Sequence, residues 1–393
     1  MRFTRTDRSV LSEWWFSVDR KLMGAVLLIM VIGTLVSLAA SPAASHRLGE
    51  PPMHFFSRHL LFLLPSVAAM IAASVLSMRQ MRRVALVLFL LGLVMIFAAF
   101  AQNIERNGAV RWLVLGGQSI QPSEFAKPGF VILTAWLFSE SGKRHDMPAL
   151  PLALLLLFAF AACLVAQPDI GQTLLITLVW GGLFFLAGYS VVWIVLAGLA
   201  AFGGFVMAYL TIPHVKSRLD RFIHPGAGDT HQTDTALAAF REGGWFGRGP
   251  GEGKVKLDLP DAHTDYIFAV IAEEFGIILC LVLVGVYAFI VWRGFRAASR
   301  SREPFIRLAL SGLMMLFGFQ ALINMAVNVD LLPAKGMTLP FISYGGSSML
   351  AMGLTMGLAV GFARRRPEGG PVYRAQAQNA RAAEMASSRG IRI

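Results

Sequence analysis

The feature that most constrains this sequence is a series of apolar blocks, each of about twenty residues and so long enough to cross the hydrocarbon core of a bilayer. A chain inside lipid must satisfy its own backbone hydrogen bonds, which restricts such blocks to α-helices. The composition agrees, since 56% of the 393 residues are hydrophobic and 15% are charged. The fold class is therefore predicted to be an all-α polytopic membrane protein. About ten transmembrane helices are expected, at residues 22–41, 58–77, 84–101, 122–139, 148–166, 169–187, 190–212, 266–292, 305–329 and 340–363.

The basic residues indicate how these helices are oriented. Most of them fall in alternate short loops, and the positive-inside rule makes that side cytoplasmic. Both termini are then cytoplasmic, and one large extracytoplasmic loop, residues 213–265, lies between helices 7 and 8. The residues used for this assignment are Arg20, Lys21, Arg79, Arg82, Arg83, Lys143, Arg144, Arg293, Arg296, Arg300, Arg302, Arg364, Arg365 and Arg366.

The domain organisation expected from this pattern is one transmembrane domain, residues 22–363, between two cytoplasmic tails. The first tail covers residues 1–21. The second, residues 364–393, is poor in large apolar residues and is expected to be disordered. The net charge of +12 would suit nucleic acid or anionic lipid, but the basic residues lie in loops and tails beside the spans. This placement favours membrane lipids as partners and argues against nucleic acid.

One candidate for chemistry stands where the large outer loop enters the eighth span. Asp261, His263 and Asp265 precede the apolar run that begins at Tyr266, so Asp265 is expected at the outer mouth of the membrane. Asp265 could be the N-cap of this helix or a general base. A metal site formed by the three residues is also conceivable, although their spacing is loose. The sequence leaves the metal unknown.

A second candidate lies about two turns inside the same span, where Glu273 and Glu274 are costly in lipid unless they meet a cation, a proton or water. Lys127 in the fourth span is an available partner, and it follows Glu124 by one turn on the same helical face. A structural ion pair and a functional role both remain open. We predict that at least one of Glu273 and Glu274 pairs with a basic residue, with Lys127 as the first candidate.

Other polar positions suggest ligand binding or packing. Arg111 and Lys127 could bind a diphosphate at the outer face or be interfacial cations that extend toward water. The Gly-rich stretch 335–348, which contains Lys335, Ser343 and Tyr344, could line a polar cavity or allow close helix packing. Asn324 and Asn328 share a helical face and suit interhelical hydrogen bonding.

The loop segment 240–251 is rich in glycine and carries Arg241 and Arg248. It is expected to be flexible and cationic. Such a segment could lie on lipid headgroups or over an anionic substrate.

Four stretches resemble the signatures of the SEDS family of membrane proteins. They are QPSEFAK (121–127), QPDIG (167–171), HTDYIFAVIAEEFG (263–276) and LPAKGMTLPFISYGGSS (332–348). Their order, spacing and span count resemble that family over about residues 20–365. The KGMT version of the last motif, residues 335–338, looks like the division-specific branch rather than the elongation branch.

The resemblance implies a peptidoglycan glycosyltransferase that polymerises lipid II at the outer face of the cytoplasmic membrane, with septal cell-wall synthesis in cell division as its setting. The implied partners are lipid II, a class B penicillin-binding protein (an FtsI-like transpeptidase) and other membrane proteins of the divisome. The family's essential aspartate matches Asp265. Motif positions expected to bind substrate or support the site are Arg111, Glu124, Lys127, Asp169, Glu273, Glu274, Lys335, Ser343 and Tyr344. No tightly bound cofactor is expected, although a divalent cation, Mg or Mn, could take part.

Physical chemistry is compatible with this activity. One base can take the proton from an acceptor hydroxyl, while cations or a divalent metal stabilise a diphosphate leaving group. The main alternatives are a lipid II flippase or transporter, in which Glu273, Glu274 and Lys127 form a relay, and an elongation paralogue. A catalytically inert scaffold for division proteins is a third reading, but it leaves the buried polar residues unexplained.

Overall fold

A computed structural model describes residues 10–105, 109–143, 146–211, 231–333 and 336–364. The chain forms two compact units, residues 20–363 and the two terminal segments together. In the terminal unit, the described residues form helix α1 (Val10–Ser17), and Arg364 Nε donates a hydrogen bond to Ser17 Oγ at 2.9 Å. Residues 10–21 of the tail predicted at 1–21 are described, whereas the tail predicted at 364–393 lies outside the described residues except for Arg364.

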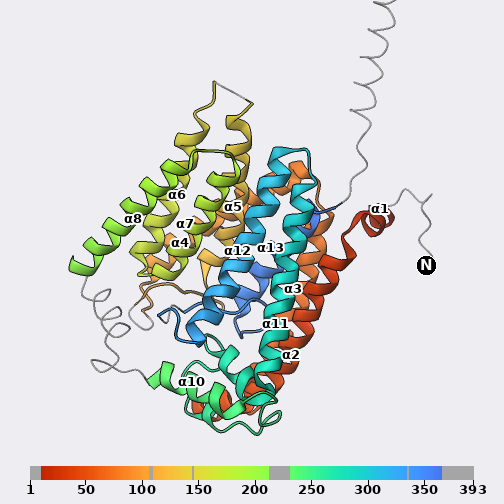
Figure 1. The fold of residues 1–393 in the computed structure, drawn as a ribbon, viewed down its shortest axis with the longest axis vertical. Helices are drawn as coiled ribbons and strands as arrows, with labels where there is room; N and C mark the ends of the chain where they lie inside the picture. The colour runs from red at the N-terminus through yellow and green to blue at the C-terminus, as the bar shows by residue number, and fades with distance from the viewer. Residues whose placement is uncertain (1–9, 106–108, 144–145, 212–230, 334–335, 365–393) are drawn as a thin grey trace, which may run out of the picture. The chain divides into compact units, whose positions relative to one another are not determined.

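The larger unit has a helix at each of the ten predicted spans (Figure 1). These helices are α2 (Arg20–Leu48), α3 (His54–Val75), α4 (Met78–Gln102), α5 (Pro122–Ser141), α6 (Ala149–Ala166), α7 (Ile170–Leu186), α8 (Val191–Thr211), α11 (Ile267–Ser299), α12 (Pro304–Asn328) and α13 (Gly346–Phe362). The described residues between α8 and α11 add α10 (His231–Gly243) and the short 3-10 helix η1 (Val255–Leu257). A two-stranded hairpin, β1 (Leu113–Leu115) and β2 (Gln118–Ile120), lies between α4 and α5.

Within the described residues, six helices are long and apolar enough to span a membrane: α2, α3, α4, α6, α11 and α12. Helices α7 and α13 are apolar but shorter. The outer surfaces of these helices expose many leucine, valine and phenylalanine side chains. Examples on α4 are Leu90, Val94 and Phe97. Lipid is the solvent that suits such a surface, so the chain is a multi-pass membrane protein.

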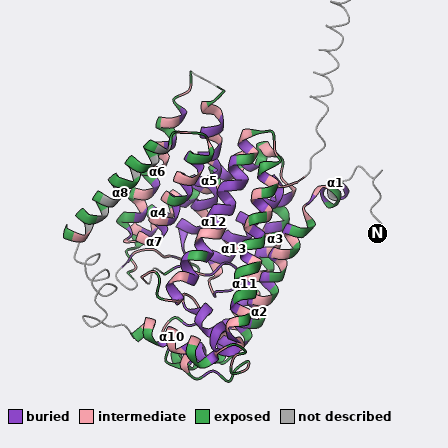
Figure 2. Cartoon of the chain, in the orientation of Figure 1, coloured by how far each residue is buried: buried purple, intermediate pink, exposed green. Residues whose placement is uncertain are grey.

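The core of the larger unit centres on α5, α12 and α13, whose residues are mostly buried (Figure 2). Helix α12 packs on α5, α7, α11 and α13, and α13 packs on α3. Glycines permit two of the closest approaches. A Cβ at Gly129 would lie 2.5 Å from the Ala85 carbonyl oxygen, and one at Gly357 would lie 2.4 Å from that of Met70. Small residues therefore allow these helices to pack backbone to backbone.

The last helix begins later than the predicted span 340–363, at Gly346. Residues 340–345 instead form a turn in which Phe341 has a φ of 65° and the Ser343 hydroxyl accepts a hydrogen bond from the Leu339 N–H at 2.7 Å. The Tyr344 N–H donates to the His263 carbonyl at 2.8 Å. Contacts across the fold have thus replaced the first helical turn, and they join this turn to the segment that precedes α11.

Helix α11 is interrupted at Gly276, which has φ 81° and ψ 172°. A left-handed φ of this kind is readily adopted only by glycine. The kink separates a short N-terminal part, which contains Glu273 and Glu274, from the long part that ends at Ser299.

Candidate active site

Arg111 is positioned by the hairpin between α4 and α5. Gly116 and Gly117 form its turn with φ values of 56° and 77°, as a two-residue hairpin connection requires. The Gln102 side chain extends the hairpin by both donating to and accepting from the Val114 backbone at 3.0 Å. Arg111 then reaches the end of α6, where Nε donates to the Gln167 carbonyl at 3.4 Å and Nη2 donates to that of Pro168.

Asp169 lies beside this guanidinium. It is the N-cap of α7, and its carboxylate accepts a hydrogen bond from the Gln172 N–H at 3.4 Å. Arg111 Nη1 is 3.8 Å from Asp169 Oδ1, and Gln121 Nε2 donates to Oδ2 at 3.4 Å. Burial raises the pKa of Asp169, and Arg111 opposes that rise. The QPSEFAK and QPDIG motifs therefore meet around Arg111.

Asp265 is held through its backbone by two asparagines of α12. Asn324 Nδ2 donates to the Asp265 carbonyl at 2.9 Å, and Asn328 Nδ2 donates to the same oxygen at 2.8 Å. Asn324 also donates to the Met337 carbonyl at 2.6 Å. These amides do more than join helices, because they fix the two loops that meet at the site. The N-cap of α11 is Tyr266 and has no side-chain cap bond, so the reading of Asp265 as N-cap is wrong.

Gly336 lies between the two charged candidates. A Cβ at this position would be 3.5 Å from Arg111 Nη1 and 3.7 Å from Asp265 Oδ2. Its φ of 65° is one that a side chain disfavours. The absence of a side chain at Gly336 keeps a narrow space between the guanidinium and the carboxylate. Three segments that are far apart in the sequence therefore converge here.

Burial, together with the neighbouring carboxylates of Asp261 and Asp169 and against the opposing effect of Arg111, raises the pKa of Asp265 to about 7. His263 behaves in the opposite way, since burial lowers its pKa to about 4 and leaves the ring neutral at pH 7. A carboxylate with a pKa near 7 suits general-base chemistry, because a base is most effective when its pKa is close to the working pH.

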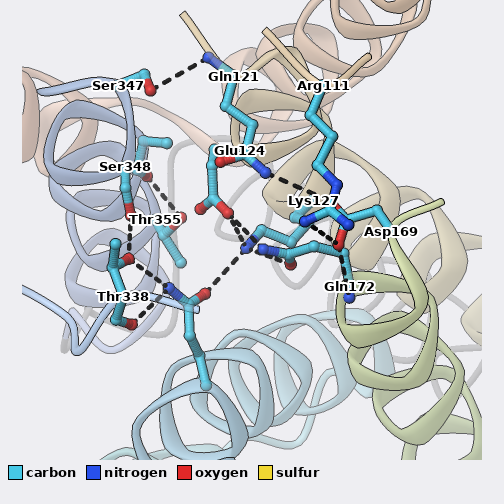
Figure 3. Close-up of polar contacts among 12 residues, drawn as sticks. Arg111, Gln121, Glu124, Lys127, Asp169, Gln172, Thr338, Ser347, Ser348 and Thr355 are labelled. Carbon is cyan, nitrogen blue, oxygen red and sulfur yellow. Dashed lines mark hydrogen bonds and ion pairs between the residues drawn. The ribbon is translucent and has the colours of Figure 1, made fainter. Parts of the chain in front are cut away.

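Lys127 lies in a network of buried polar side chains that adjoins Asp169 through Gln172 (Figure 3). Its Nζ donates to Glu124 Oε1 at 2.7 Å, to Gln172 Oε1 at 3.0 Å and to Gln320 Oε1 at 2.9 Å. Gln320 Nε2 continues the network to Thr338. An ammonium group has three donors, and all three are used. Lys127 thus joins α5, α7 and α12 and has no donor left for a diphosphate.

The predicted pairing of Glu273 or Glu274 with a cation is confirmed, but Lys127 as the partner is wrong. Lys256 Nζ donates to Glu274 Oε1. Both Glu273 oxygens accept backbone N–H bonds, from Val255 at 2.7 Å and Lys256 at 2.9 Å. The outer loop folds back onto α11 and supplies the partners, which a span-by-span reading of the sequence cannot anticipate.

Of the remaining predicted residues, Ser343 and Tyr344 contact the segment before α11, and Lys335 is not described. Ser343 donates to the Thr264 carbonyl at 2.6 Å and so braces the segment that carries Asp265. Tyr344, His263 and Phe55 form a ring cluster with centroids 4.3 to 5.7 Å apart. Lys335 lies outside the described residues.

No group of three or more His, Cys, Asp or Glu residues within the described ranges could hold a metal ion. The arrangement of Asp261, His263 and Asp265 as a three-ligand site is therefore not formed. Asp261 and Asp265 nevertheless repel each other, as the raised pKa of Asp265 indicates. A cation between them would relieve that repulsion.

Several residues of the site were missed from the sequence. Gln172, Gln320 and Thr338 complete the Lys127 network, and their uncharged side chains inside or beside apolar spans gave little signal. Lys256 was overlooked in a loop, although it stands between the apolar residues Val255 and Leu257. Gly336 could have been suspected only from its place beside Lys335 in the motif.

Three kinds of comparison place the chain. Its helices and buried polar site define a polytopic membrane protein, and residues 19–367 match the family model described as "Cell cycle protein", which covers FtsW, RodA and SpoVE. The chain belongs to this FtsW/RodA/SpoVE family, the SEDS family of the sequence analysis.

Relatives with curated descriptions include one from Caulobacter vibrioides and one from Alkalilimnicola ehrlichii, each described as a "probable peptidoglycan glycosyltransferase FtsW". The first is 46% identical over 93% of this chain and 94% of the relative, and the second is 36% identical over 88% of each.

Solved structures show the same fold. A chain from a peptidoglycan synthase complex, studied for its coordination of polymerization and crosslinking, has a TM-score of 0.72 at 25% identity and covers 89% of this chain and 98% of its own. The rod shape determining protein RodA of Thermus thermophilus has a TM-score of 0.66 at 27% identity, with 90% and 99% coverage.

Proposed function

We propose that this protein is the peptidoglycan glycosyltransferase of septal cell-wall synthesis, with lipid II as substrate. The observation that carries the proposal is that Arg111 and Asp265, whose pKa is raised to about 7, both lie next to Gly336. An aspartate that can act as a base near a cation suits glycosyl transfer, and the chain's relatives are described as glycosyltransferases.

In this proposal Asp265 removes the proton from the acceptor hydroxyl as that oxygen attacks the donor sugar at its anomeric carbon. Arg111 stabilises the diphosphate that leaves. Arg111 suits this role better than Lys127, because it is more exposed and the carbonyls of Gln167 and Pro168 use only two of its five N–H donors. Asp169 and Gln121 would then support Arg111, while Lys127 and Glu124 hold the helices.

We include a divalent cation, Mg or Mn, in the proposal. Asp261 and Asp265 would hold it together with substrate oxygens, and it would supply further charge stabilisation for the leaving group. The mutual repulsion of these two carboxylates supports such an ion. Chelation followed by addition of Mg or Mn tests this part by its effect on polymerisation.

The proposal also includes the finer topology and the setting. All ten helices at the predicted spans cross the membrane, both termini are cytoplasmic, and the loop between α8 and α11 faces outside. A class B penicillin-binding protein is proposed as the partner, because one structural neighbour comes from a peptidoglycan synthase complex. The septum is the proposed site of action.

The decisive experiment asks whether the purified protein, with and without a class B penicillin-binding protein, converts lipid II in detergent to glycan strands. The Asp265→Asn variant should fold and bind lipid II but form no polymer, and Asp258→Asn, an exposed aspartate of the same loop, is the matched control. Polymer from Asp265→Asn at the wild-type rate would refute the base assignment. Transport of lipid II across liposomes without any polymer would favour a flippase instead.

A further inference from the structure

The segment between α10 and η1 is fixed to the kink of α11 by backbone hydrogen bonds. The Arg248 N–H donates to the Glu273 carbonyl at 2.8 Å, and the Gly249 N–H donates to that of Glu274 at 2.9 Å. In return, the Ile277 and Ile278 N–H groups donate to the carbonyls of Gly244 and Trp245, at 2.9 and 3.3 Å. The kink frees these four groups of α11, and the loop satisfies all of them. The expected flexibility of the loop is therefore wrong for residues 243–249.

Three glycines allow this close contact. A Cβ at Gly243 would lie 1.9 Å from the Ala272 carbonyl oxygen, one at Gly247 would lie 2.2 Å from that of Glu274, and one at Gly276 would lie 2.2 Å from that of Trp245. Distances this short leave no room for a side chain. The backbone of the segment is thus locked against α11, and the direction of its side chains is set.

The locked turn exposes two large aromatic side chains, Trp245 at 63% and Phe246 at 83%. They are attached at the level of Ile277 and Ile278. Beyond the kink, α11 exposes Ile278, Leu281 and Val282, as expected of a span that faces lipid. The two aromatic residues therefore continue the lipid-facing surface of α11.

The depth of this turn follows from the helix geometry. Ile278 precedes Arg293, at the basic end of α11, by fifteen residues, which is about 22 Å at 1.5 Å per residue. The hydrocarbon core is about 30 Å thick. With Arg293 at the inner boundary, Ile278 lies inside the outer half of that core. Irregular backbone is tolerated at such a depth where the protein satisfies its polar groups, and here the kink of α11 satisfies the N–H groups of Arg248 and Gly249 and the carbonyls of Gly244 and Trp245.

We propose that residues 243–249 form a re-entrant anchor that inserts Trp245 and Phe246 into the outer leaflet of the bilayer. Trp is enriched at membrane interfaces because its ring is largely apolar and carries one N–H donor. The exposed Arg241 precedes the turn and suits anionic headgroups, whereas Arg248, within the turn, is paired with Glu242. The anchor ties the short part of α11, which follows Asp265, to the membrane surface.

The test is a measurement of depth by spin labelling of the full chain in nanodiscs of phosphatidylcholine and phosphatidylglycerol. Cys163 and Cys280 are first replaced by alanine, and a nitroxide is attached to Phe246→Cys. Leu281→Cys on the exposed face of α11 is the lipid reference, and Glu252→Cys on the same loop is the water reference. Collision with oxygen, which prefers lipid, is compared with collision with a water-soluble nickel chelate.

The label at position 246 should collide with oxygen more than with nickel, as the label at 281 does and in contrast to the label at 252. Preference for nickel would overturn the proposal by placing the turn in water. Protection from both reagents would also overturn it, since protein would then cover the turn. An independent measurement without labels uses lipids with brominated acyl chains, which quench tryptophan fluorescence. The part of the wild-type fluorescence that Trp245→Phe lacks should be quenched by these lipids.

Discussion

Replacement of Lys127 by methionine tests whether this lysine holds the fold or binds substrate. Its ammonium group donates to Glu124, Gln172 and Gln320 at 2.7 to 3.0 Å, and the residue is 1% exposed. In Lys127→Met, the Glu124 carboxylate would keep only the Gln172 Nε2 donor at 2.8 Å. Its second oxygen has no hydrogen-bond partner among the described residues even in the wild type.

The expected loss follows from the cost of leaving a buried charge unpaired. Removal of one partner of a buried ion pair typically destabilises a protein by about 3–5 kcal/mol, whereas replacement of both by neutral groups is often nearly neutral. Lys127→Met should therefore lower the free energy of unfolding by about 3–5 kcal/mol. The double variant Lys127→Met/Glu124→Gln should recover most of that loss, since no charge remains.

Thermal unfolding of the purified protein in detergent measures the effect. At roughly 2–4 °C per kcal/mol for a large domain, the single variant should unfold on the order of 10 °C below wild type. Lys143→Met is the matched control, because Lys143 is half-exposed and contacts Glu140 only at 3.8 Å. It should change the midpoint by less than about 2 °C. An unchanged midpoint for Lys127→Met, combined with weaker lipid II binding, would refute the structural role.

Three further predictions concern the site and the outer loop. Polymerisation should rise with pH through about 7, because Asp265 must lose its proton to act as a base. Arg111→Gln should move this rise to higher pH, since Arg111 lowers the pKa of Asp265. An unchanged pH profile in this variant would contradict the coupling. Gly336→Ala should fold with a loss of about 1 kcal/mol from its left-handed φ but polymerise more slowly, because its Cβ enters the space between Arg111 and Asp265; wild-type turnover would show that this space is not used. Lys256→Met should lower the free energy of unfolding by about 3–5 kcal/mol because it leaves Glu274 unpaired, whereas Lys254→Met, at an exposed position, should not. Equal thermal unfolding midpoints for Lys256→Met and Lys254→Met would refute the pairing.

Much of the fold could be predicted from the sequence because membrane helices are specified locally. A run of apolar residues as long as the bilayer is thick must be helical, whatever its neighbours are. Each of the ten predicted ranges accordingly contains a helix. Pro122 begins α5, as its missing N–H favours. The pairing of Glu124 with Lys127 was also local, since three residues separate them on one helical face.

The sequence could not determine which distant groups meet. Glu274 pairs with Lys256 and not with Lys127, because the outer loop folds back and binds the kink that Gly276 introduces into α11. Helix α13 begins at Gly346 and not at the predicted residue 340, because the residues before it form hydrogen bonds with His263 and Thr264. Each outcome depends on hydrogen bonds between segments far apart in the chain, and no local pattern encodes them.

The sequence by itself determined that this protein is a bundle of membrane helices, that it belongs to a recognisable family, and which polar residues in it are costly enough to need a role. Only the tertiary structure decided which groups these residues meet. It turned Lys127 toward three buried acceptors and left Arg111 facing Asp265 across Gly336. The physical reason is that helix formation in lipid depends on the composition of one segment, whereas the free energy of a buried charged group depends on every segment that surrounds it.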